Sequence, residues 1–333
     1  MTEANLKTYL HTLPATGAFL TVTGHPAPDT DAVISALFEA WRLTLGGTPA
    51  VPLVQGSIPR ETAWLLGGLA SAVPTADEVD PTARLVLTDH HDVDAYPNPV
   101  VQIVDHHPLS VGVDLSGVHA AILPVGAATT LVARRLRADG ILPDAYCARV
   151  LLGAILLDTE GLSPFKAKAE DLDTAAWLSA LCGEDPTALF AALQAELLSE
   201  TDIVTLYRRD YRRYTAPDGS PFLGWAILKV WADACPDLEG VRALLAADPA
   251  PTRVAKIVLH RPDGTREEYY LADGAAADTL LTVVQTASGE GARREAPDTV
   301  YLPASCHHWG RKRYAARLIE ILGKNRKKSP KKP

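Results

Sequence analysis

The sequence predicts an α/β protein whose N-terminal part is a mainly parallel β-sheet flanked by helices. Three observations support this fold class. Between residues 18 and 198, short apolar runs alternate with longer segments whose apolar residues recur at helical spacing. The short runs are apolar on both faces, as strands of buried parallel sheets are. Several runs are followed by Asp or His, at the sheet edge where open α/β sheets bind ligands.

The elements of this first domain follow from the alternation. Apolar runs of strand length, bounded by turn residues, lie at 18–23, 51–54, 84–88, 100–104 and 119–123. Helical spacing predicts helices at 32–45, 61–70, 127–138, 145–157, 169–182 and 186–198. Alternating strands and helices of this kind are typical of α/β domains. We therefore predict one domain over residues 1–198.

The pattern changes after residue 198 and predicts a second, smaller α/β domain over residues 199–333. Its expected elements are a connecting helix at 199–214, a turn at 217–219, strands at 222–230, 253–260 and 267–271, and helices at 237–247 and 309–322. Residues 275–302 show no clear periodicity beyond a loop at 288–291. The basic tail, residues 324–333, is expected to be a frayed, solubilising end rather than an arm for polyanions.

Composition narrows the classes of function. No run of about 18 apolar residues occurs and Met1–Lys7 is polar, so we expect neither a transmembrane helix nor a signal peptide. Four cysteines without a CxxC pair favour a reducing cytoplasm and argue against a thiolate zinc site. The net charge of −8 argues against general nucleic-acid binding. It still allows a phosphate substrate, because bound divalent ions would invert the local field.

Candidate metal ligands stand just after four of the predicted elements. They are His25, Asp29, Asp31, Asp89, His106 and Asp158. Carboxylates and imidazoles without thiolates suit manganese, magnesium, cobalt or zinc. The residues that follow parallel strands meet at one edge of the sheet, so the first five can converge. Asp158 ends a predicted helix, and it joins them only if that helix returns to the same edge.

Each of these residues also has an ordinary structural explanation. Asp29 could cap the following helix, and Asp89 and Asp105 could form turns. Asp158 could be a solvated helix end, and His107 could line the core. Their occurrence at four element ends together favours a metal centre. Six ligands exceed the roughly three of a catalytic zinc site, and they suit two ions that share one carboxylate. Such a pair, about 3.5–4 Å apart, can clamp the oxygens of a phosphoryl displacement and turn a shared water into hydroxide.

These segments resemble the four motifs of the DHH phosphoesterase superfamily. They are Gly24-His25-x-x-Pro28-Asp29-Thr30-Asp31-Ala32, Asp89-His90, Asp105-His106-His107 and Leu156-Leu157-Asp158-Thr159. The sequence is most similar to the family II, or manganese-dependent, inorganic pyrophosphatases. Gly310-Arg311-Lys312-Arg313 resembles their Ser-Arg-Lys-Lys signature. The resemblance implies a DHH domain followed by a DHHA2-like domain, with the active site in the cleft between them.

The resemblance also implies individual roles. The ligands of one ion would be His25, Asp29 and Asp89. The ligands of the second would be Asp31, Asp89, His106 and Asp158, so that Asp89 bridges. The substrate-binding residues would be His107, Arg209, Arg311 and Lys312. His107 and Asp89 would be the catalytic residues, with His107 contacting the phosphoryl group and protonating the leaving group.

Two segments depart from the family pattern at substrate-binding positions. Arg208-Arg209-Asp210 resembles the Arg-Lys-Asp stretch of related exopolyphosphatases, where the pyrophosphatases use a lysine. Gly310 and Arg313 replace the usual serine and second lysine. His25 favours a pyrophosphatase, because the eukaryotic exopolyphosphatases usually have asparagine at this position.

The expected function is therefore metal-dependent hydrolysis of inorganic pyrophosphate to two phosphates by a hydroxide held between two metal ions. The alternative is an exopolyphosphatase acting on tripolyphosphate or longer chains. A DHH nuclease is disfavoured because no Gly-Gly-Gly-His element is present, and a binding protein without turnover is disfavoured by the intact ligand set. Mn²⁺ is the expected cofactor, with Co²⁺, Mg²⁺ or Zn²⁺ as alternatives and further Mg²⁺ or Mn²⁺ bound with the substrate. By resemblance we expect a homodimer. The cysteines, the net charge and the lack of a long apolar run lead us to expect a cytoplasmic protein that binds neither nucleic acid nor membranes.

Overall fold

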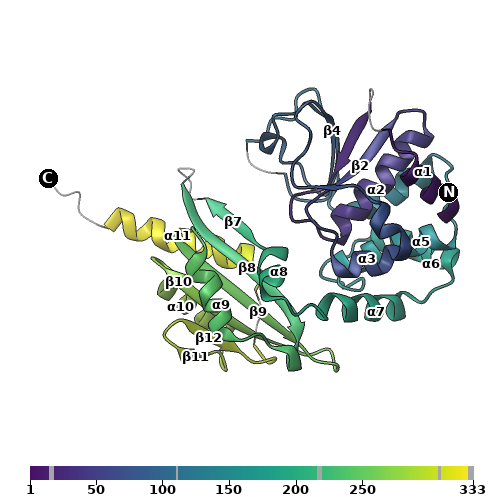
Figure 1. Cartoon of the computed structure of the whole chain (residues 1–333). Helices are drawn as coiled ribbons and strands as arrows, with labels where there is room; N and C mark the ends of the chain where they lie inside the picture. Colours follow the sequence, from purple (N-terminus) through teal and green to yellow (C-terminus); the bar gives the residue numbers. More distant parts are fainter. Residues whose placement is uncertain (15–18, 110–111, 216–219, 307–308, 329–333) are drawn as a thin grey trace. The chain divides into compact units, whose positions relative to one another are not determined.

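The computed structural model describes residues 1–14, 19–109, 112–215, 220–306 and 309–328 (Figure 1). Within this range, the side chains of residue 312 and of residues 322–328 are not described. The chain divides into two compact units, Met1–Glu196 and Leu197–Pro333. The turn predicted at 217–219 and the end of the predicted basic tail, 329–333, lie outside the described residues.

A six-stranded parallel sheet forms the framework of the first unit. Its strands are β1 (Leu20–Thr23), β2 (Ala50–Gln55), β3 (Thr75–Ala76), β4 (Arg84–Thr88), β5 (Val100–Asp105) and β6 (His119–Ile122). They are ordered β3-β2-β1-β4-β5-β6, and the described pairs are parallel. The predicted parallel sheet is thereby confirmed. The strand order reverses direction between β1 and β4, and such a switch point leaves a crevice at the carboxyl ends of the two strands.

Helices of the first unit share one large core with this sheet. They are α1 (Glu3–His11), α2 (Thr30–Leu45), α3 (Arg60–Leu66), α4 (Ala128–Ala138), α5 (Ala145–Asp158), α6 (Ala169–Cys182) and α7 (Pro186–Leu198), with short 3₁₀ turns at Gly67–Ala72 and Val93–Ala95. The core joins Val22, Val86 and Val104 of the sheet to helix residues such as Phe38. On the strands β4 and β5, Leu85, Leu87 and Ile103 form a separate small cluster. The sheet is therefore covered mainly by helices, as predicted.

Two N-terminal helical features differ from the prediction. No element is predicted for residues 3–11, yet α1 forms there and buries Leu6, Tyr9 and Leu10. The Tyr9 hydroxyl donates to the carbonyl of Ala50 at 2.7 Å, which ties α1 to β2. The helix predicted at 61–70 ends at Leu66, because Gly67 has a positive φ of 53° that a continuing helix does not allow.

A buried carboxylate connects three elements of the first unit. Glu39 of α2 is 0% exposed. Its Oε2 accepts a hydrogen bond from Nε of Arg42 at 2.8 Å. Its Oε1 accepts from Nε2 of Gln102 on β5 at 2.7 Å and lies 3.3 Å from Nη2 of Arg135 on α4. Glu39 is thus a charged link between α2, β5 and α4, the elements that also carry the candidate metal ligands or adjoin them.

The second unit contains a mixed six-stranded sheet. Its strands are β7 (Arg212–Thr215), β8 (Pro221–Trp231), β9 (Thr252–His260), β10 (Arg266–Gly274), β11 (Arg293–Ala296) and β12 (Thr299–Leu302), in the order β11-β12-β10-β9-β8-β7. β8 and β9 run parallel, and the other described pairs are antiparallel. Its helices are α8 (Ile203–Arg209), α9 (Leu238–Ala247), α10 (Ala277–Ser288) and α11 (Arg311–Lys328), with a 3₁₀ turn at Ala232–Ala234. This is the smaller α/β domain that the sequence predicts.

Three predictions for the second unit are corrected. The helix predicted at 199–214 is shorter, because Asp210 leaves the helical conformation and Arg212–Thr215 pairs with β8 as a strand. Residues 275–302, which show no periodicity, form α10, β11 and β12. The backbone of α11 continues to Lys328, so the first half of the predicted frayed tail is helical. Among the described residues, no helix is both long and apolar enough to cross a membrane.

Candidate metal centre

The loop between β1 and α2 carries His25, Asp29 and Asp31. Asp29 is the N-cap of α2, and its Oδ1 accepts a hydrogen bond from the amide of Ala32 at 3.0 Å. Its second oxygen, Oδ2, lies 3.7 Å from Nε2 of His25. The capping role and a place in the metal centre therefore coexist, because each uses a different oxygen of the same carboxylate.

Asp31 is held by the first turn of another helix. Its carboxylate is 1% exposed. Oδ2 accepts from the amide of Ala128 at 2.6 Å, and Oδ1 accepts from the amide of Thr129 at 2.8 Å. Both amides belong to the N-terminus of α4, where unpaired N–H groups and the helix dipole stabilise a negative charge. These two hydrogen bonds therefore hold the Asp31 carboxylate in place without a bound ion.

Asp89 follows β4 directly and occupies the middle of the site. It has a positive φ of 61°, a conformation that few residues other than glycine adopt but that Asp tolerates better than most. Its side chain is 2% exposed. Oδ2 lies 3.4 Å from Nε2 of His25, and Oδ1 lies 3.1 Å from Nε2 of His106. Unusual backbone conformations of this kind concentrate at functional sites.

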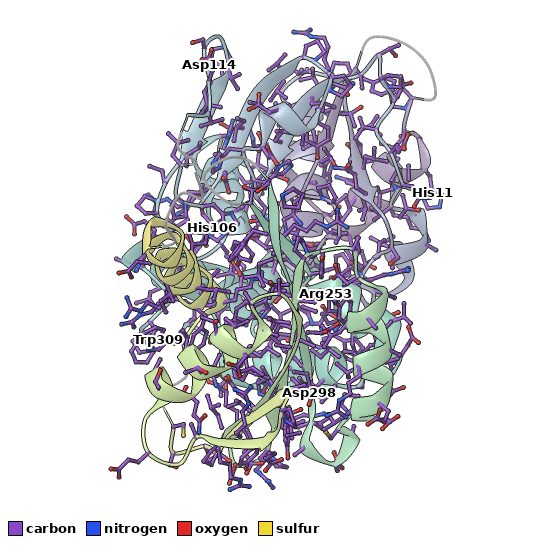
Figure 2. All side chains as sticks on the ribbon, turned by 90° about the vertical axis from the view of Figure 1, so that its left-hand side faces the viewer. His11, His106, Asp114, Arg253, Asp298 and Trp309 are labelled. Atoms are coloured by element: carbon purple, nitrogen blue, oxygen red, sulfur yellow. The ribbon has the colours of Figure 1, made fainter. Side chains whose placement is uncertain are left out.

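His106 and Asp158 complete the six predicted ligands. His106, which is labelled in Figure 2, follows the last residue of β5, and its Nδ1 lies 3.1 Å from the carbonyl of Val125. A carbonyl only accepts, so Nδ1 carries a proton, and in the neutral ring Nε2 keeps a lone pair suited to a metal ion. Nε2 lies 3.4 Å from Oδ2 of Asp158 and 3.9 Å from Oδ2 of Asp31. Asp158 ends α5, so this helix does return to the carboxyl edge of the sheet.

The six side chains fall into two compact groups. One contains His25, Asp29 and Asp89, and the other contains Asp31, His106 and Asp158. Within each group the candidate ligand atoms all lie within 4.8 Å of one another. Ligands about 2.0–2.2 Å from one ion lie at most about 4.4 Å apart, so each group needs only a small contraction to hold one. Asp89 contacts both groups through its two oxygens. The donors and their spacing therefore fit two hard divalent ions.

The neighbouring carboxylates raise the pKa values of the imidazoles in this cluster. Burial by itself would lower the pKa of His25, but the adjacent Asp29 and Asp89 outweigh it and raise the pKa well above its ordinary value. In the same way, burial of His106 opposes the effect of Asp89, Asp31 and Asp158, and its pKa rises to about 10. Without metal ions, both imidazoles therefore hold protons at neutral pH.

The carboxylates repel one another in the same space. Burial, followed by the charges of Asp89 and Asp158, raises the pKa of Asp31 well above its ordinary value. Burial likewise raises the pKa of Asp158 to about 6. The pKa of Asp89 is instead lowered, because the neighbouring His106 and His25 outweigh the effect of its burial. Perturbed pKa values of this kind, raised for Asp31 and Asp158 and lowered for Asp89, cluster at functional sites and are consistent with a metal site.

We expect the affinity for Mn²⁺ to rise steeply with pH. A bound ion requires the neutral forms of His25 and His106, whose pKa values are raised in the metal-free protein. The bound state therefore holds fewer protons, and the association constant should rise by about tenfold per pH unit for each proton released. Calorimetric titrations with Mn²⁺ between pH 6 and 8, in buffers of different ionisation enthalpy, measure the number released. An affinity independent of pH would contradict this prediction.

Gly24 is required where β1 meets the start of α2. A β-carbon at this position would lie 2.6 Å from Cβ, 2.8 Å from the carbonyl oxygen and 2.9 Å from Cα of Ala32. The substitution Gly24→Ala should therefore displace the ligand loop from α2, lower the free energy of unfolding by about 1–3 kcal/mol and weaken Mn²⁺ binding. The matched control is Gly68→Ala, where a β-carbon meets nothing within 4 Å. Thermal unfolding and Mn²⁺ titration of both variants test this, and equal behaviour of the two would contradict it.

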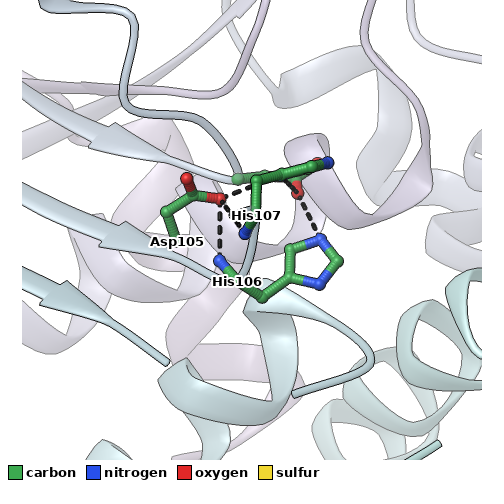
Figure 3. Close-up of side chains that lie close together, drawn as sticks. Asp105, His106 and His107 are labelled. Carbon is green, nitrogen blue, oxygen red and sulfur yellow. Dashed lines mark hydrogen bonds and ion pairs between the residues drawn. The ribbon is translucent and has the colours of Figure 1, made fainter. Parts of the chain in front are cut away.

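Asp105 is not a turn residue, which was its alternative explanation from the sequence. It is the last residue of β5 and is 0% exposed. Its Oδ1 accepts from the amides of His106 and His107 and from Nδ1 of His107, at 2.7, 3.1 and 2.9 Å (Figure 3). Its Oδ2 accepts from Nδ1 of His91 at 2.5 Å. His107 is 39% exposed, so it does not line the core as its own alternative explanation supposed.

Sequence reasoning missed His91 altogether. It follows Asp89 by two residues and is 5% exposed. The one available signal was its position, since His91 stands just beyond β4 in the same run of polar residues as Asp89. The pairing with Asp105 joins the ends of two neighbouring strands, and it becomes visible only once the sheet is formed.

The predicted substrate-binding residues of the second unit are partly brought together. Arg311, the first residue of α11, donates from Nη1 to the backbone carbonyl of Asp210 at 2.8 Å and lies 2.6 Å from its Oδ1. The two basic segments singled out in the sequence are therefore neighbours in this unit. Nη1 of Arg209 donates to the carbonyl of Leu197 at 3.1 Å. The side chain of Lys312 lies outside the described residues.

Known proteins resemble this chain over most of its length, although no family model matches it. It is 31% identical over 220 residues to the "Probable manganese-dependent inorganic pyrophosphatase" of Deinococcus radiodurans, covering 62% of this chain and 69% of the relative. It is 27% identical over 279 residues to the "Manganese-dependent inorganic pyrophosphatase" of Methanothrix thermoacetophila, covering 81% of this chain and 86% of the relative.

A solved structure shares the fold of this chain. The structure named "Crystal structure of Methanococcus jannaschii putative family II inorganic pyrophosphatase" superposes with a TM-score of 0.68 at 20% identity, over 91% of this chain and 99% of that one. This structural similarity, at 20% identity, shows only the fold. Membership of the family is shown by the 31% sequence identity to the Deinococcus protein. The chain belongs to the family of manganese-dependent inorganic pyrophosphatases.

Proposed function

We propose that this chain hydrolyses inorganic pyrophosphate to two phosphates with Mn²⁺ as its metal cofactor. The observation that carries the proposal is the pair of ligand groups joined by Asp89 at the switch point between β1 and β4. The relatives named as manganese-dependent inorganic pyrophosphatases support the same reaction and the same metal.

The six side chains would divide between two ions. His25 and Asp29 would bind the first, Asp31, His106 and Asp158 the second, and Asp89 both. When bound, two such ions neutralise phosphate charge and lower the pKa of a water molecule. The donor set supports this division, because it contains only the oxygen and nitrogen ligands that hard divalent ions prefer. Residues 1–198 would thus be the catalytic DHH domain.

His107 is the candidate for contact with the reacting phosphoryl group. Its ring is partly exposed, and its Nδ1 is engaged with Asp105. The other ring nitrogen, Nε2, would face the substrate and deliver a proton to the departing phosphate. Arg209, Arg311 and Lys312 of the DHHA2-like domain, residues 199–333, would bind substrate oxygens, since guanidinium groups bind phosphate in a bidentate manner.

A panel of substrates and metals tests the function. The full chain, stripped of metal and reloaded, is assayed for phosphate release from pyrophosphate, tripolyphosphate, long polyphosphate and a short oligonucleotide, with Mn²⁺, Co²⁺, Mg²⁺ and Zn²⁺ in turn. We expect the highest specific activity with pyrophosphate and Mn²⁺. A higher activity on tripolyphosphate would establish the exopolyphosphatase alternative instead, and no release from any phosphoanhydride would overturn the proposal.

Replacing Arg311 should weaken substrate binding. A hydrogen bond to a charged group contributes about 1.5–3 kcal/mol, so Arg311→Ala should raise KM for pyrophosphate by about 10–100-fold. The matched control is Arg317→Ala on the same helix, an exposed arginine that forms an ion pair with Glu320 three residues further along. Steady-state kinetics of both variants with Mn²⁺ measure the difference. An unchanged KM for Arg311→Ala would remove this residue from the substrate site.

We further propose that the protein acts in the cytoplasm as a homodimer, without nucleic-acid or membrane partners. The cysteines, Cys147, Cys182, Cys235 and Cys306, are all free, which suits a reducing compartment. Among the described strands, β6 pairs only with β5 and so leaves a sheet edge open to a second copy. Light scattering of the purified chain tests the dimer, and a monomer at micromolar concentration would contradict it.

A further inference from the structure

The carboxylate of Asp105 lies between two histidines and has no exposure to solvent. On one side it accepts from Nδ1 of His107 at 2.9 Å, and on the other from Nδ1 of His91 at 2.5 Å. His91 and Asp105 are 5% and 0% exposed, whereas the side chain of His107 is 39% exposed. The three residues therefore form a chain of hydrogen bonds that leads from the interior to the open part of the metal centre.

We propose that His91 and Asp105 are positioning residues that fix the orientation and the Nδ1–H tautomer of the His107 imidazole. The proposal rests on the proposed function, in which His107 contacts the phosphoryl group. It assigns to His91 a role that neither its sequence position nor the relatives' names suggest.

The bonding pattern leaves the Asp105 carboxylate little freedom. Its Oδ1 already accepts from the amides of His106 and His107, at 2.7 and 3.1 Å. These two bonds fix one oxygen from the backbone of its own loop. The bond from His91 fixes the other oxygen from the neighbouring strand end. The carboxylate can therefore neither rotate about its last bond nor turn toward Asp89 without losing a buried hydrogen bond, which is costly.

A fixed carboxylate in turn fixes the imidazole beside it. Ionised carboxylates only accept hydrogen bonds, so Nδ1 of His107 must carry a proton. Nε2 is then the nitrogen through which His107 meets a substrate. The ring of His107 also lies edge-on to that of His106, with centroids 4.4 Å apart. This edge-on contact also restricts rotation of the His107 ring.

A purely structural role for His91 predicts a different result when His91 is removed. If His91 only joined the ends of β4 and β5, its loss would lower stability and leave turnover per loaded enzyme unchanged. If it positions His107, its loss should reduce kcat much more than it affects KM or Mn²⁺ affinity, because neither His91 nor its hydrogen bond touches substrate or the six ligands. Partners of this outer kind typically contribute about 10–100-fold.

The experiment compares three variants with the wild-type chain. His91→Leu removes the donor, and His91→Asn keeps an N–H close to the position of Nδ1. The control His119→Leu makes the same change at an exposed histidine of β6. We expect His91→Leu to lower kcat for pyrophosphate by about 10–100-fold with KM and Mn²⁺ affinity within about twofold of wild type. His91→Asn should restore most of kcat, and His119→Leu should leave it unchanged.

A second readout does not depend on turnover. In the Mg²⁺-loaded chain, the ¹⁵N shifts of the His107 ring report its tautomer, with the signals assigned by their loss in His107→Gln. Wild type and His91→Asn should show the Nδ1–H form, and His91→Leu or Asp105→Asn a mixture of tautomers. Asp105→Asn is nearly isosteric, so it tests the same chain of bonds if His91→Leu fails to fold.

The outcomes separate this inference from the proposed function. An active wild type with unchanged kcat in folded His91→Leu, or an unchanged His107 tautomer in both His91→Leu and Asp105→Asn, would overturn the inference alone. A wild type without activity on any phosphoanhydride would overturn the proposed function, and the tautomer would still decide whether Asp105 and His91 hold the His107 ring.

Discussion

Replacing Asp89 by asparagine should abolish most pyrophosphate hydrolysis and most Mn²⁺ binding together. Asp89 contacts both ligand groups, through Oδ2 toward His25 and Oδ1 toward His106. Asparagine has nearly the same volume but brings no negative charge and only one oxygen. Loss of an outer partner of a metal ligand costs about 10–100-fold, so loss of a ligand shared by two groups should cost more than about 100-fold in kcat/KM.

The stability of the same variant provides an independent measurement. A ligand that binds only the folded state stabilises it, by about 2.7 kcal/mol when its concentration is 100 times Kd. Excess Mn²⁺ should therefore raise the Tm of the wild-type chain clearly and that of Asp89→Asn much less. The control is Asp94→Ala, an exposed aspartate a few residues further along. Full Mn²⁺ stabilisation of Asp89→Asn, or more than a tenth of wild-type kcat/KM, would show that Asp89 is not shared between two ions.

Glu39→Ala should have the largest effect on folding. The substitution removes a fully buried carboxylate and leaves the Arg42 side chain, 13% exposed, with Asp139 as its remaining ion-pair partner among the described residues. It also deprives Gln102 of β5 of its acceptor and Arg135 of α4 of its nearest carboxylate. Breaking a buried ion pair on one side costs about 3–5 kcal/mol, so we expect a loss of this size in the free energy of unfolding.

The control for Glu39 is an ion pair on the surface of the same unit. Arg137 and Asp173 are 3.2 Å apart, with side chains 52% and 64% exposed. Asp173→Ala should change the free energy of unfolding by less than about 1 kcal/mol, because exposed pairs contribute little. Urea denaturation followed by circular dichroism compares the two variants. A loss below about 1 kcal/mol for Glu39→Ala would mean that the arginines find other partners.

The strand ends of the first unit were predictable because several signals coincide there. The runs before His25, Asp89 and His106 are apolar on both faces, and only a buried parallel strand explains such runs when helices alternate with them. Parallel strands end at a common edge, so the convergence of these residues followed from topology. The place of Asp158 did not, because a helix end has no such constraint and depends on how α5 packs against α2 and α6.

Other elements could not be read from local pattern. Residues 212–215 are basic and aromatic, and they form β7 only because β8 offers a free edge to pair with. Helix α1 was overlooked although Leu6, Tyr9 and Leu10 have helical spacing, because the segment is short and polar and owes its stability to packing. The same reason hid His91, since a hydrogen bond across two strands leaves no periodic trace in the chain.

The attachment of Asp31 to α4 has a consequence for the evolution of this centre. Its two oxygens accept hydrogen bonds from the amides of Ala128 and Thr129 at the N-terminus of α4, which lies far from Asp31 in the sequence. If Asp31 binds an ion as proposed, a substitution at this position would remove both a metal ligand and the anion at the N-terminus of α4. Among the described contacts, His25 makes no comparable hydrogen bonds to a helix N-terminus. We therefore expect changes in metal preference to arise from substitutions of His25 before substitutions of Asp31.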